Sequence, residues 1–187
     1  MGLGNIGGEL FRLGWGLGFR RLLAYSPHGP KFGETYVGTE FTDLETVMCE
    51  SDFVTINCPL NEGTRGLIGA RQLALMKPTA YLINTSRGAV VDEAALVAAL
   101  REQRIAGAGI DVFENEPALA GHPLLELENA VLCPHSVART QECTRDTSIS
   151  ACDSVLDVFR GKARLYVVNE SVLSRPGMRK KLSRMYS

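Results

Sequence analysis

Three glycines at the start of the chain restrict its fold more than any other feature. Gly2, Gly4 and Gly7 form the pattern G-x-G-x-x-G within the opening residues MGLGNIGGEL. This pattern is typical of the turn that follows a β-strand and opens a helix, where the backbone approaches the pyrophosphate of a dinucleotide. The glycines therefore predict a nucleotide-binding α/β fold, although only Met1 precedes the first of them.

Short apolar or β-branched segments alternate with segments whose apolar residues recur at helical spacing. We expect strands at residues 21–25, 53–57, 80–84, 106–110 and 130–133. We expect helices from Ile6 to about residue 17, after Asp43 and Asp92, at 70–76, and over a long segment that ends before Gly161. In this last helix we expect Ile149, Cys152, Val155, Leu156 and Phe159 to face inward. The alternation predicts a doubly wound parallel sheet of Rossmann type, with helices on both faces.

Composition narrows the range of partners and compartments. The 187 residues suffice for one domain with a tail, and 45% of them are apolar, which is enough for a buried core. The formal net charge of −1 gives no reason to expect a nucleic-acid or membrane partner, and no segment has the features of a signal peptide. Because the cysteines lack a C-x-x-C pair, we expect reduced, mostly buried thiols in a cytoplasmic protein, without a metal site. The cysteines are Cys49, Cys58, Cys133, Cys143 and Cys152.

The C-terminal segment differs in composition from the rest of the chain. From Arg175 onward it has the sequence RPGMRKKLSRMYS, which is basic and lacks acidic residues. We expect a solvated, partly disordered tail here rather than a nucleic-acid-binding or targeting signal. The predicted organisation is one dinucleotide-binding domain over residues 1–169 and a basic tail over residues 170–187.

Polar residues follow three of the expected strands. Arg87 follows the strand that ends at Asn84, and Asp111 follows the strand that ends at residue 110, with Glu116 in the next loop. His135 comes shortly after the strand that ends at residue 133. Because ligands of open parallel sheets bind beyond the carboxyl ends of the strands, we expect these side chains at the same edge as the glycines.

This set of side chains suits the reduction of a 2-keto acid. Arg87 offers a planar fork of donors for a carboxylate, and His135 can supply a proton if Glu116 favours its protonated form. Each residue also has an ordinary explanation: a surface ion pair for Arg87, and turns or loops for the other two. His28 and His122 lie in expected loops without comparable partners, so we do not expect either to be the catalytic acid.

Four segments resemble the D-isomer-specific 2-hydroxyacid dehydrogenase family and follow the family's order. They are VTINCPLNEGTRGLIG (54–69), LINTSRGAVVDEAAL (82–96), GAGIDVFENEP (107–117) and VLCPHS (131–136). The resemblance runs from Gly2 to about Asn169. It implies that Arg87 binds substrate, that His135 is the general acid/base and that Glu116 is its partner. It also implies a set of cofactor-binding residues: Gly2, Gly4, Asn5, Ile6, Cys58, Pro59, Thr85 and, at the nicotinamide carboxamide, Asp111.

The sequence departs from the family pattern at the end of the second strand. In NAD-binding proteins this position usually carries an acidic residue that holds the ribose hydroxyls, whereas here it is Ser26. Without a carboxylate, a 2′-phosphate meets no repulsion, and Ser26 can donate a hydrogen bond to it, supported by His28 or Lys31. We therefore expect NAD or NADP as cofactor, with NADP tolerated; the alternative is a serine that only relaxes selectivity.

A second departure lies ahead of the glycines. Family members carry a substrate-binding domain and the first strand of the sheet there, and neither is present in this sequence. The first strand is central in the order 3-2-1-4-5-6, so its absence removes hydrogen bonds from two neighbours. We expect an incompletely paired sheet in a chain that borrows a strand, rearranges or belongs to a longer product.

These observations lead to one functional interpretation with two alternatives. The interpretation is an oxidoreductase that transfers a hydride between NAD(P)H and a small 2-keto or 2-hydroxy acid such as glyoxylate or hydroxypyruvate. We expect little turnover by this chain alone, because half of the substrate pocket is missing. The resemblance also implies a homodimer. The alternatives are a dinucleotide-binding interaction or regulatory module, and an inactive fragment.

Overall fold

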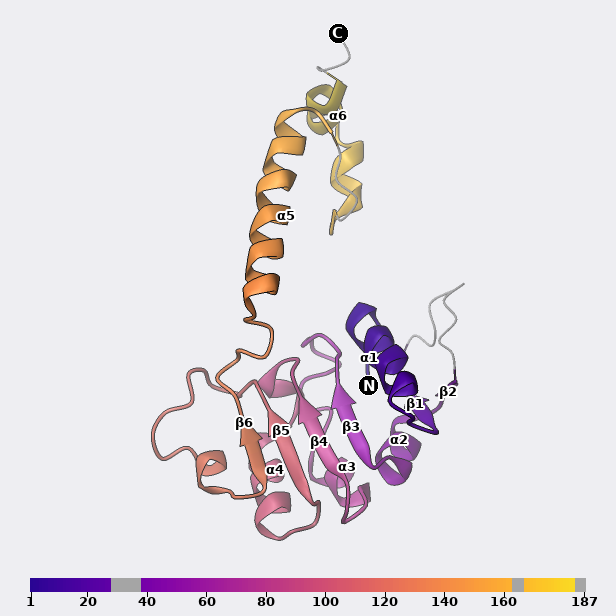
Figure 1. Ribbon diagram of the computed structural model, residues 1–187, viewed down its shortest axis with the longest axis vertical. Helices are drawn as coiled ribbons and strands as arrows, with labels where there is room; N and C mark the ends of the chain where they lie inside the picture. The colour runs from indigo at the N-terminus through magenta and orange to yellow at the C-terminus, as the bar shows by residue number, and fades with distance from the viewer. Residues whose placement is uncertain (28–37, 163–166, 184–187) are drawn as a thin grey trace. The chain divides into compact units, whose positions relative to one another are not determined.

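The computed structural model describes residues 1–27, 38–162 and 167–183, which form two compact units. The first unit spans residues 1–137 and holds all the strands described, whereas the second spans residues 138–187 and is helical (Figure 1). The first unit has the α/β architecture with parallel strands that the alternating sequence pattern predicts.

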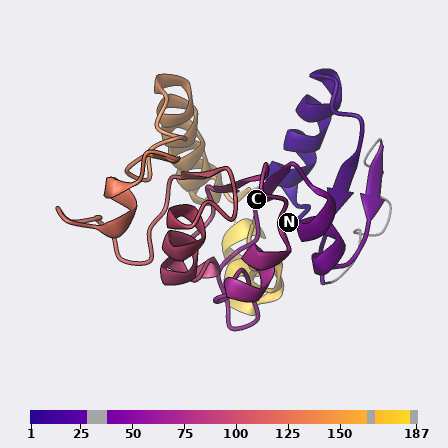
Figure 2. The same cartoon turned by 90° about the horizontal axis from the view of Figure 1, so that it is seen from below.

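The strands of the first unit form two parallel sheets. One sheet pairs β1 (Leu22–Ala24) with β2 (Thr39–Phe41). The other has the order β3-β4-β5-β6, made of β3 (Phe53–Ile56), β4 (Tyr81–Asn84), β5 (Gly107–Ile110) and β6 (Ala130–Leu132). Figure 2 shows β1 and β2 with the first helix at one side of the unit.

The register of the larger sheet brings the strand ends level with one another. Ile56 pairs with Asn84, Asn84 with Ile110, and Ile110 with Leu132, so the last residues of the four strands lie in one row. The loops that follow these strands therefore leave the sheet at one edge. This edge carries the candidate site.

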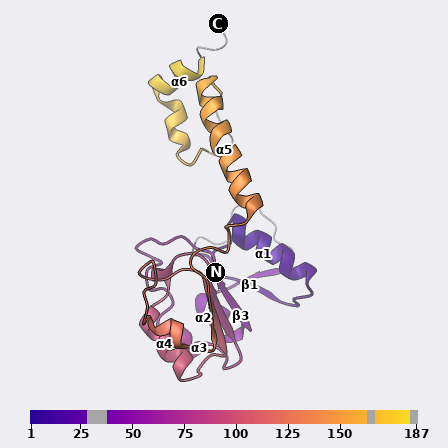
Figure 3. The ribbon, with the colours of Figure 1, turned by 60° about the vertical axis from the view of Figure 1, so that its left-hand side comes forward.

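The helices of the first unit begin where the sequence pattern places them. They are α1 (Asn5–Gly16), α2 (Leu44–Glu50), α3 (Ala70–Leu75) and α4 (Glu93–Arg101). Asp43 and Asp92 are N-caps whose side chains accept hydrogen bonds from Thr46 N at 2.7 Å and Ala95 N at 3.0 Å. In Figure 1, α3 and α4 lie behind the larger sheet, and Figure 3 shows them on one side of the strands.

The backbone of Met1 occupies a strand position between the two sheets. Its terminal nitrogen donates to Thr55 O on β3 at 2.7 Å, and its carbonyl oxygen accepts from Asn57 N at 2.8 Å. On the other side, Gly2 N donates to Tyr25 O, just beyond β1, at 3.0 Å. Three hydrogen bonds of Met1 and Gly2 thus lie between β3 and the end of β1, which belong to different sheets, so the expected incomplete pairing is present in the structure.

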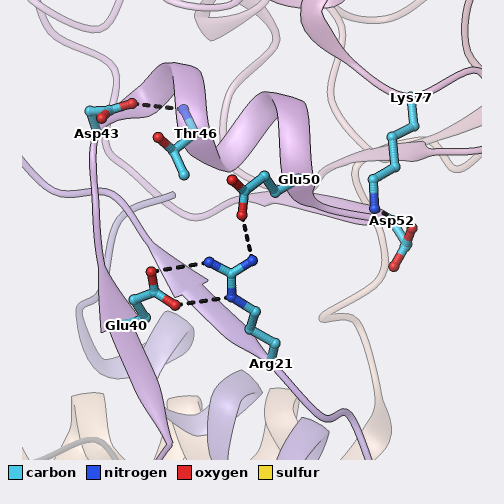
Figure 4. Close-up of polar contacts among 7 residues, drawn as sticks. All are labelled: Arg21, Glu40, Asp43, Thr46, Glu50, Asp52 and Lys77. Carbon is cyan, nitrogen blue, oxygen red and sulfur yellow. Dashed lines mark hydrogen bonds and ion pairs between the residues drawn. The ribbon is translucent and has the colours of Figure 1, made fainter.

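An ion-pair cluster ties the smaller sheet to α2 at the opposite end of the strands (Figure 4). Arg21 binds Glu40 of β2 through two hydrogen bonds of 3.0 and 3.1 Å, and it also binds Glu50 at the end of α2. Nearby, Lys77 binds Asp52 at 2.8 Å and so links the end of α3 to the start of β3. The side chains of these pairs are largely exposed, so each pair contributes little to stability.

The core of the first unit lies between the larger sheet and helices α2, α3 and α4. Its fully buried members come from the strands, from the helices and from the loops between them. They include Met48, Val54, Ile56, Ile68, Leu73, Leu82, Leu96, Leu100, Ile105 and Leu124.

Three expectations differ from the structure. Strand β2 has no counterpart in the sequence analysis, because its sequence Thr-Glu-Phe contains no apolar run such as those of β1 and β6, which are equally short. The cysteines are free, but none is buried: Cys58 and Cys133 are half-buried, and Cys49, Cys143 and Cys152 are exposed. The inward orientation expected for the last long helix is also wrong: α5 (Gln141–Phe159) has no buried residue, and the five side chains expected to face inward are exposed.

The second unit contains more helix than the sequence analysis predicts. After α5 it holds a 3-10 helix, η3 (Glu170–Ser174), and α6 (Pro176–Ser183), within the segment expected to be a tail. Pro176 at the first helical position favours this helix, as do the Met, Arg, Lys and Leu residues that follow Gly177. Among the helices described in either unit, none combines the length and the apolar character needed to cross a membrane.

Candidate active site

The glycine loop lies at the carboxyl edge of the strands, and its three glycines have different surroundings. Gly2 has φ of +79°, and a Cβ there would lie 2.7 Å from Cys58 N. A Cβ on Gly7 would lie 2.3 Å from Gly2 O, so this glycine allows α1 to pack against the turn. A Cβ on Gly4 would meet no atom within 4 Å. The first and third glycines permit close packing, and the second leaves an open approach to the backbone.

The start of α1 provides further features of an anion site. Gly4 is the N-cap and provides no side-chain cap, and Asn5 and Ile6 in the first turn are exposed. The free N–H groups at a helix N-terminus carry partial positive charge and suit a phosphate. The residues present therefore fit the pyrophosphate of a dinucleotide.

The other expected cofactor residues lie beyond the ends of neighbouring strands. Ser26 is half-buried two residues after β1, Cys58 and Pro59 follow β3, and Thr85 is exposed directly after β4. Burial raises the pKa of the Cys58 thiol, so this group is neutral at pH 7. His28 and Lys31, the supporting residues expected near Ser26, lie outside the described residues.

A turn directly after β4 presents Arg87. Asn84 is buried, and its Oδ1 accepts from Ser86 N at 3.0 Å and from Ser86 Oγ at 2.9 Å, while its Nδ2 donates to Arg87 O at 3.0 Å. Arg87 itself is exposed and donates from Nη1 to Ser86 O at 2.6 Å. Asn84 was not among the expected site residues, although asparagine often accepts a hydrogen bond from the backbone N–H two residues further on, as it does here from Ser86 N.

Asp111 shapes the loop that carries His135. Its carboxylate is buried and accepts from Ser136 N at 2.7 Å and from Val137 N at 3.3 Å. Its carbonyl oxygen accepts from His135 N at 2.7 Å. These bonds hold His135 at φ of +52°, in the left-handed region that side chains rarely adopt. No local sequence pattern indicates this supporting role of Asp111, and its expected contact with a nicotinamide stays a prediction.

Glu116 and His135 are in direct contact. Glu116 Oε2 lies 2.8 Å from His135 Nδ1, and Glu116 Oε1 accepts from Phe113 N at 3.1 Å. The hydrogen bond from His135 lowers the pKa of Glu116, and the Phe113 N–H and the charge of Arg87 lower it further. An ionised carboxylate can only accept, so the proton of this bond lies on Nδ1. No hydrogen bond to Nε2 is found within the described part of the chain.

A small, mostly apolar pocket of about 230 Å³ opens beside this pair. Its walls come from the end of β6 and from the segment that follows β5. The lining residues are Phe113, Glu116, Pro117, Ala118, Leu125, Leu132, Cys133, Pro134 and His135. The acid–base pair is thus the main polar feature of a cavity of the size of a small molecule.

One expectation about the other histidines is wrong. His122 was expected to lack a carboxylate partner, but its Nε2 lies 2.9 Å from Glu93 Oε1. The two residues are 29 positions apart in sequence, so no local pattern indicates the contact.

The fold and the site together define a class. A glycine loop that fits a pyrophosphate, and a histidine–carboxylate pair at the same edge of a parallel sheet, are features of a nucleotide-binding domain of an α/β dehydrogenase. The chain belongs to the D-isomer specific 2-hydroxyacid dehydrogenase family: the family's NAD binding domain matches residues 1–137. This confirms the resemblance seen in the sequence.

Individual relatives support the same assignment. A glyoxylate reductase of Aeropyrum pernix is 40% identical over 179 residues, which cover 95% of this chain and 53% of the relative. A glyoxylate/hydroxypyruvate reductase B of Enterobacter agglomerans is 41% identical, covering 92% of this chain and 54% of the relative. The NAD-complexed D-isomer specific 2-hydroxyacid dehydrogenase of Lactobacillus delbrueckii ssp. bulgaricus superposes with a TM-score of 0.80 at 32% identity, covering 90% and 54% of the two chains. The chain spans about half the length of the curated relatives that it matches.

Proposed function

We propose that this chain supplies the cofactor domain and the acid–base pair of an oxidoreductase that interconverts a small 2-keto acid and its 2-hydroxy acid, with NAD(P) as cofactor. The observation that carries the proposal is the 2.8 Å contact between Glu116 and His135 at the edge that carries the glycine loop. The names of the relatives point to glyoxylate or hydroxypyruvate as the keto acid.

Each residue of the site has a defined part in the reaction. When bound, the reduced nicotinamide supplies a hydride to the keto carbon. The exposed Arg87 binds the substrate carboxylate through the donors not used by Ser86 O. His135 gives a proton from Nε2 to the keto oxygen as that oxygen gains charge. Glu116, held ionised, keeps the Nδ1–H bond and stabilises the charged imidazole before the proton leaves.

Backbone groups of the glycine loop would hold the phosphates of the cofactor, and residues that follow the strands would hold the rest of it. Gly2 and Gly4 would line the pyrophosphate, and Cys58, Pro59 and Thr85 would line the cleft. Ser26 supports acceptance of NADP as well as NAD, because it lacks the charge that repels a 2′-phosphate. Titration of NADH and NADPH against Ser26→Asp tests this, since the acidic variant should lose NADPH affinity selectively.

The assembly and compartment of the whole protein are part of the same proposal. We expect a cytoplasmic homodimer. The exposed apolar side chains of α5, such as Val155 and Phe159, support a partner surface on this helix. The family resemblance supports association of two copies.

Steady-state oxidation of NADH and NADPH with glyoxylate and hydroxypyruvate tests the activity. The 187-residue chain should show little turnover, and an N-terminally extended version with a substrate-binding domain should show turnover that His135→Ala removes. An extended protein that binds cofactor but reduces no small keto acid would instead indicate a regulatory or interaction module. Failure of both forms to bind cofactor would indicate an inactive fragment.

A further inference from the structure

A second histidine–carboxylate pair lies outside the proposed acid–base pair. His122 Nε2 lies 2.9 Å from Glu93 Oε1, and the two side chains are only 13% and 20% exposed. His122 Nδ1 accepts from Leu124 N at 3.3 Å, so Nε2 carries the hydrogen and donates to Glu93. The ring of Phe113 meets the His122 ring edge-on, with 5.3 Å between ring centroids.

Glu93 also binds the start of the loop segment 114–122, whose last residue is His122. Its Oε2 accepts from Glu114 N at 3.1 Å, while its Oε1 faces His122. Glu93 lies in the first turn of α4, a helix whose apolar face is buried in the core of the first unit. One carboxylate therefore fastens both ends of the segment 114–122 to a rigid helix.

This segment carries Glu116, and the backbone at its start contacts Glu116 and the residue next to Arg87. Glu116 accepts from Phe113 N, the residue directly before the Glu93 contact at Glu114. Gly88, next to Arg87, lies so close to the loop that a Cβ there would come within 2.0 Å of Phe113 backbone atoms. Residues 114–117 are themselves exposed, so their own burial does little to fix them.

We propose that Glu93 is a positioning residue for the acid–base pair: by holding Glu114 and His122 together it keeps Glu116 within hydrogen-bonding distance of His135. The inference rests on the proposed function for its catalytic meaning. The positioning itself is a property of the folded chain and can be measured without turnover.

The first test is the titration of the Glu116 carboxyl group in the 187-residue chain, followed by carbon-13 NMR. Glu93→Gln keeps the size of the side chain but leaves one acceptor oxygen for two donors. We expect the pKa of Glu116 to rise toward its usual value, because its contact with His135 is lost for part of the time. Glu126→Gln is the matched control: Glu126 also links this region to α4, but through a hydrogen bond from Arg101 at 3.3 Å rather than through a bond to segment 114–122. It should leave the Glu116 pKa unchanged.

A second variant cuts the same link from the other side. His122→Asn keeps an acceptor near Leu124 N but is too short to reach Glu93. It should move the Glu116 pKa in the same direction as Glu93→Gln. In an active, extended form of the protein, both variants should lower kcat about tenfold with little change in the KM for the keto acid.

The outcomes separate positioning from simple stability. If both variants lower Tm but leave the Glu116 pKa as in the parent chain, Glu93 is only a structural residue and the proposal is overturned. If the pKa rises in both while no extended protein reduces a keto acid, positioning is supported and the proposed function fails. If the pKa rises and kcat falls together, both are supported.

Discussion

At the scale of single residues, the ionisation of Glu116 follows from its contact with His135. The hydrogen bond lowers the pKa of Glu116, so its ionised form is favoured in the folded chain. This contribution to stability is present above the usual carboxyl pKa and is lost as the pH falls through the lowered one. In His135→Ala we expect the Glu116 pKa to rise toward its usual value and this acid-induced loss of stability to become smaller, because the folded and unfolded chains then bind protons more equally.

Carboxyl NMR with urea unfolding at several pH values measures both effects. Glu9 is the internal control: its pKa is lowered by Arg12, within α1, and should not respond to the His135 substitution. A Glu116 pKa that stays equally low in His135→Ala would show that the pair does not exist in solution.

The glycine loop allows a contrast between binding and folding. Gly4→Ala adds a methyl group to open space, so Tm should hardly change while the Kd for NADH rises at least tenfold. Gly7→Ala places its Cβ against Gly2 O and should destabilise the chain by about 1–3 kcal/mol. Thermal melts and fluorescence titration with NADH measure the two quantities. Unchanged NADH affinity in Gly4→Ala would mean that the pyrophosphate does not approach this loop.

Residues of the site differ in how far the sequence predicts them. Glu116 and His135 could be expected together because each follows a strand end, and level strand ends share an edge. Glu93 and His122 could not, because helix position and loop closure decide their contact. The supporting role of Asp111 was hidden in the same way, since its partners are backbone amides of residues 25 positions away.

At the scale of elements, the helix caps are the most predictable features. Asp92 accepts from Ala95 N at 3.0 Å and so satisfies one free donor at the start of α4. Asp92→Ala should lower the free energy of unfolding by about 1 kcal/mol, whereas Asp92→Asn should keep most of it. Urea unfolding of the three chains measures the difference. Equal losses in both variants would show that charge, rather than the cap bond, stabilises the helix.

Elements that depend on distant partners are less predictable. The capped helices α2 and α4 were placed from a few neighbouring residues, because caps and periodicity are local. Strand β2 exists through its pairing with β1, which no local pattern in three residues can show. The apolar stripe of α5 indicates a face to be covered, but not what covers it, and this explains the wrong expectation that it faces inward.

At the scale of the whole molecule, the position between β1 and β3 that Met1 occupies, here called the slot, makes the stability of the chain depend on pH. Burial lowers the pKa of the Met1 amine from 8.0 to about 6, because its charge is removed from water. The unfolded chain binds more protons between these values, so stability should rise with pH from 6 to 8, by up to about 3 kcal/mol. Acetylation of Met1 keeps the N–H that donates to Thr55 O and should abolish this rise.

An N-terminal extension tests the slot directly. Four or five β-branched residues joined to Met1 would place a strand between β1 and β3 and add ladder hydrogen bonds on both sides. The extended chain should melt at a higher temperature than the acetylated one. Equal Tm values would show that the slot does not accept a strand.

Transfer of an isotopic label tests whether this site carries out hydride transfer to a keto acid. The version of the protein extended by a substrate-binding domain is given glyoxylate with NADH deuterated at either C4 position. The mass of the glycolate formed is then measured by mass spectrometry. We expect glycolate that carries one deuterium from one of the two labelled forms, and loss of this product in His135→Ala. Glycolate formed without the label, or formed equally well by His135→Ala, would contradict the assignment of Arg87, Glu116 and His135 to hydride-transfer chemistry.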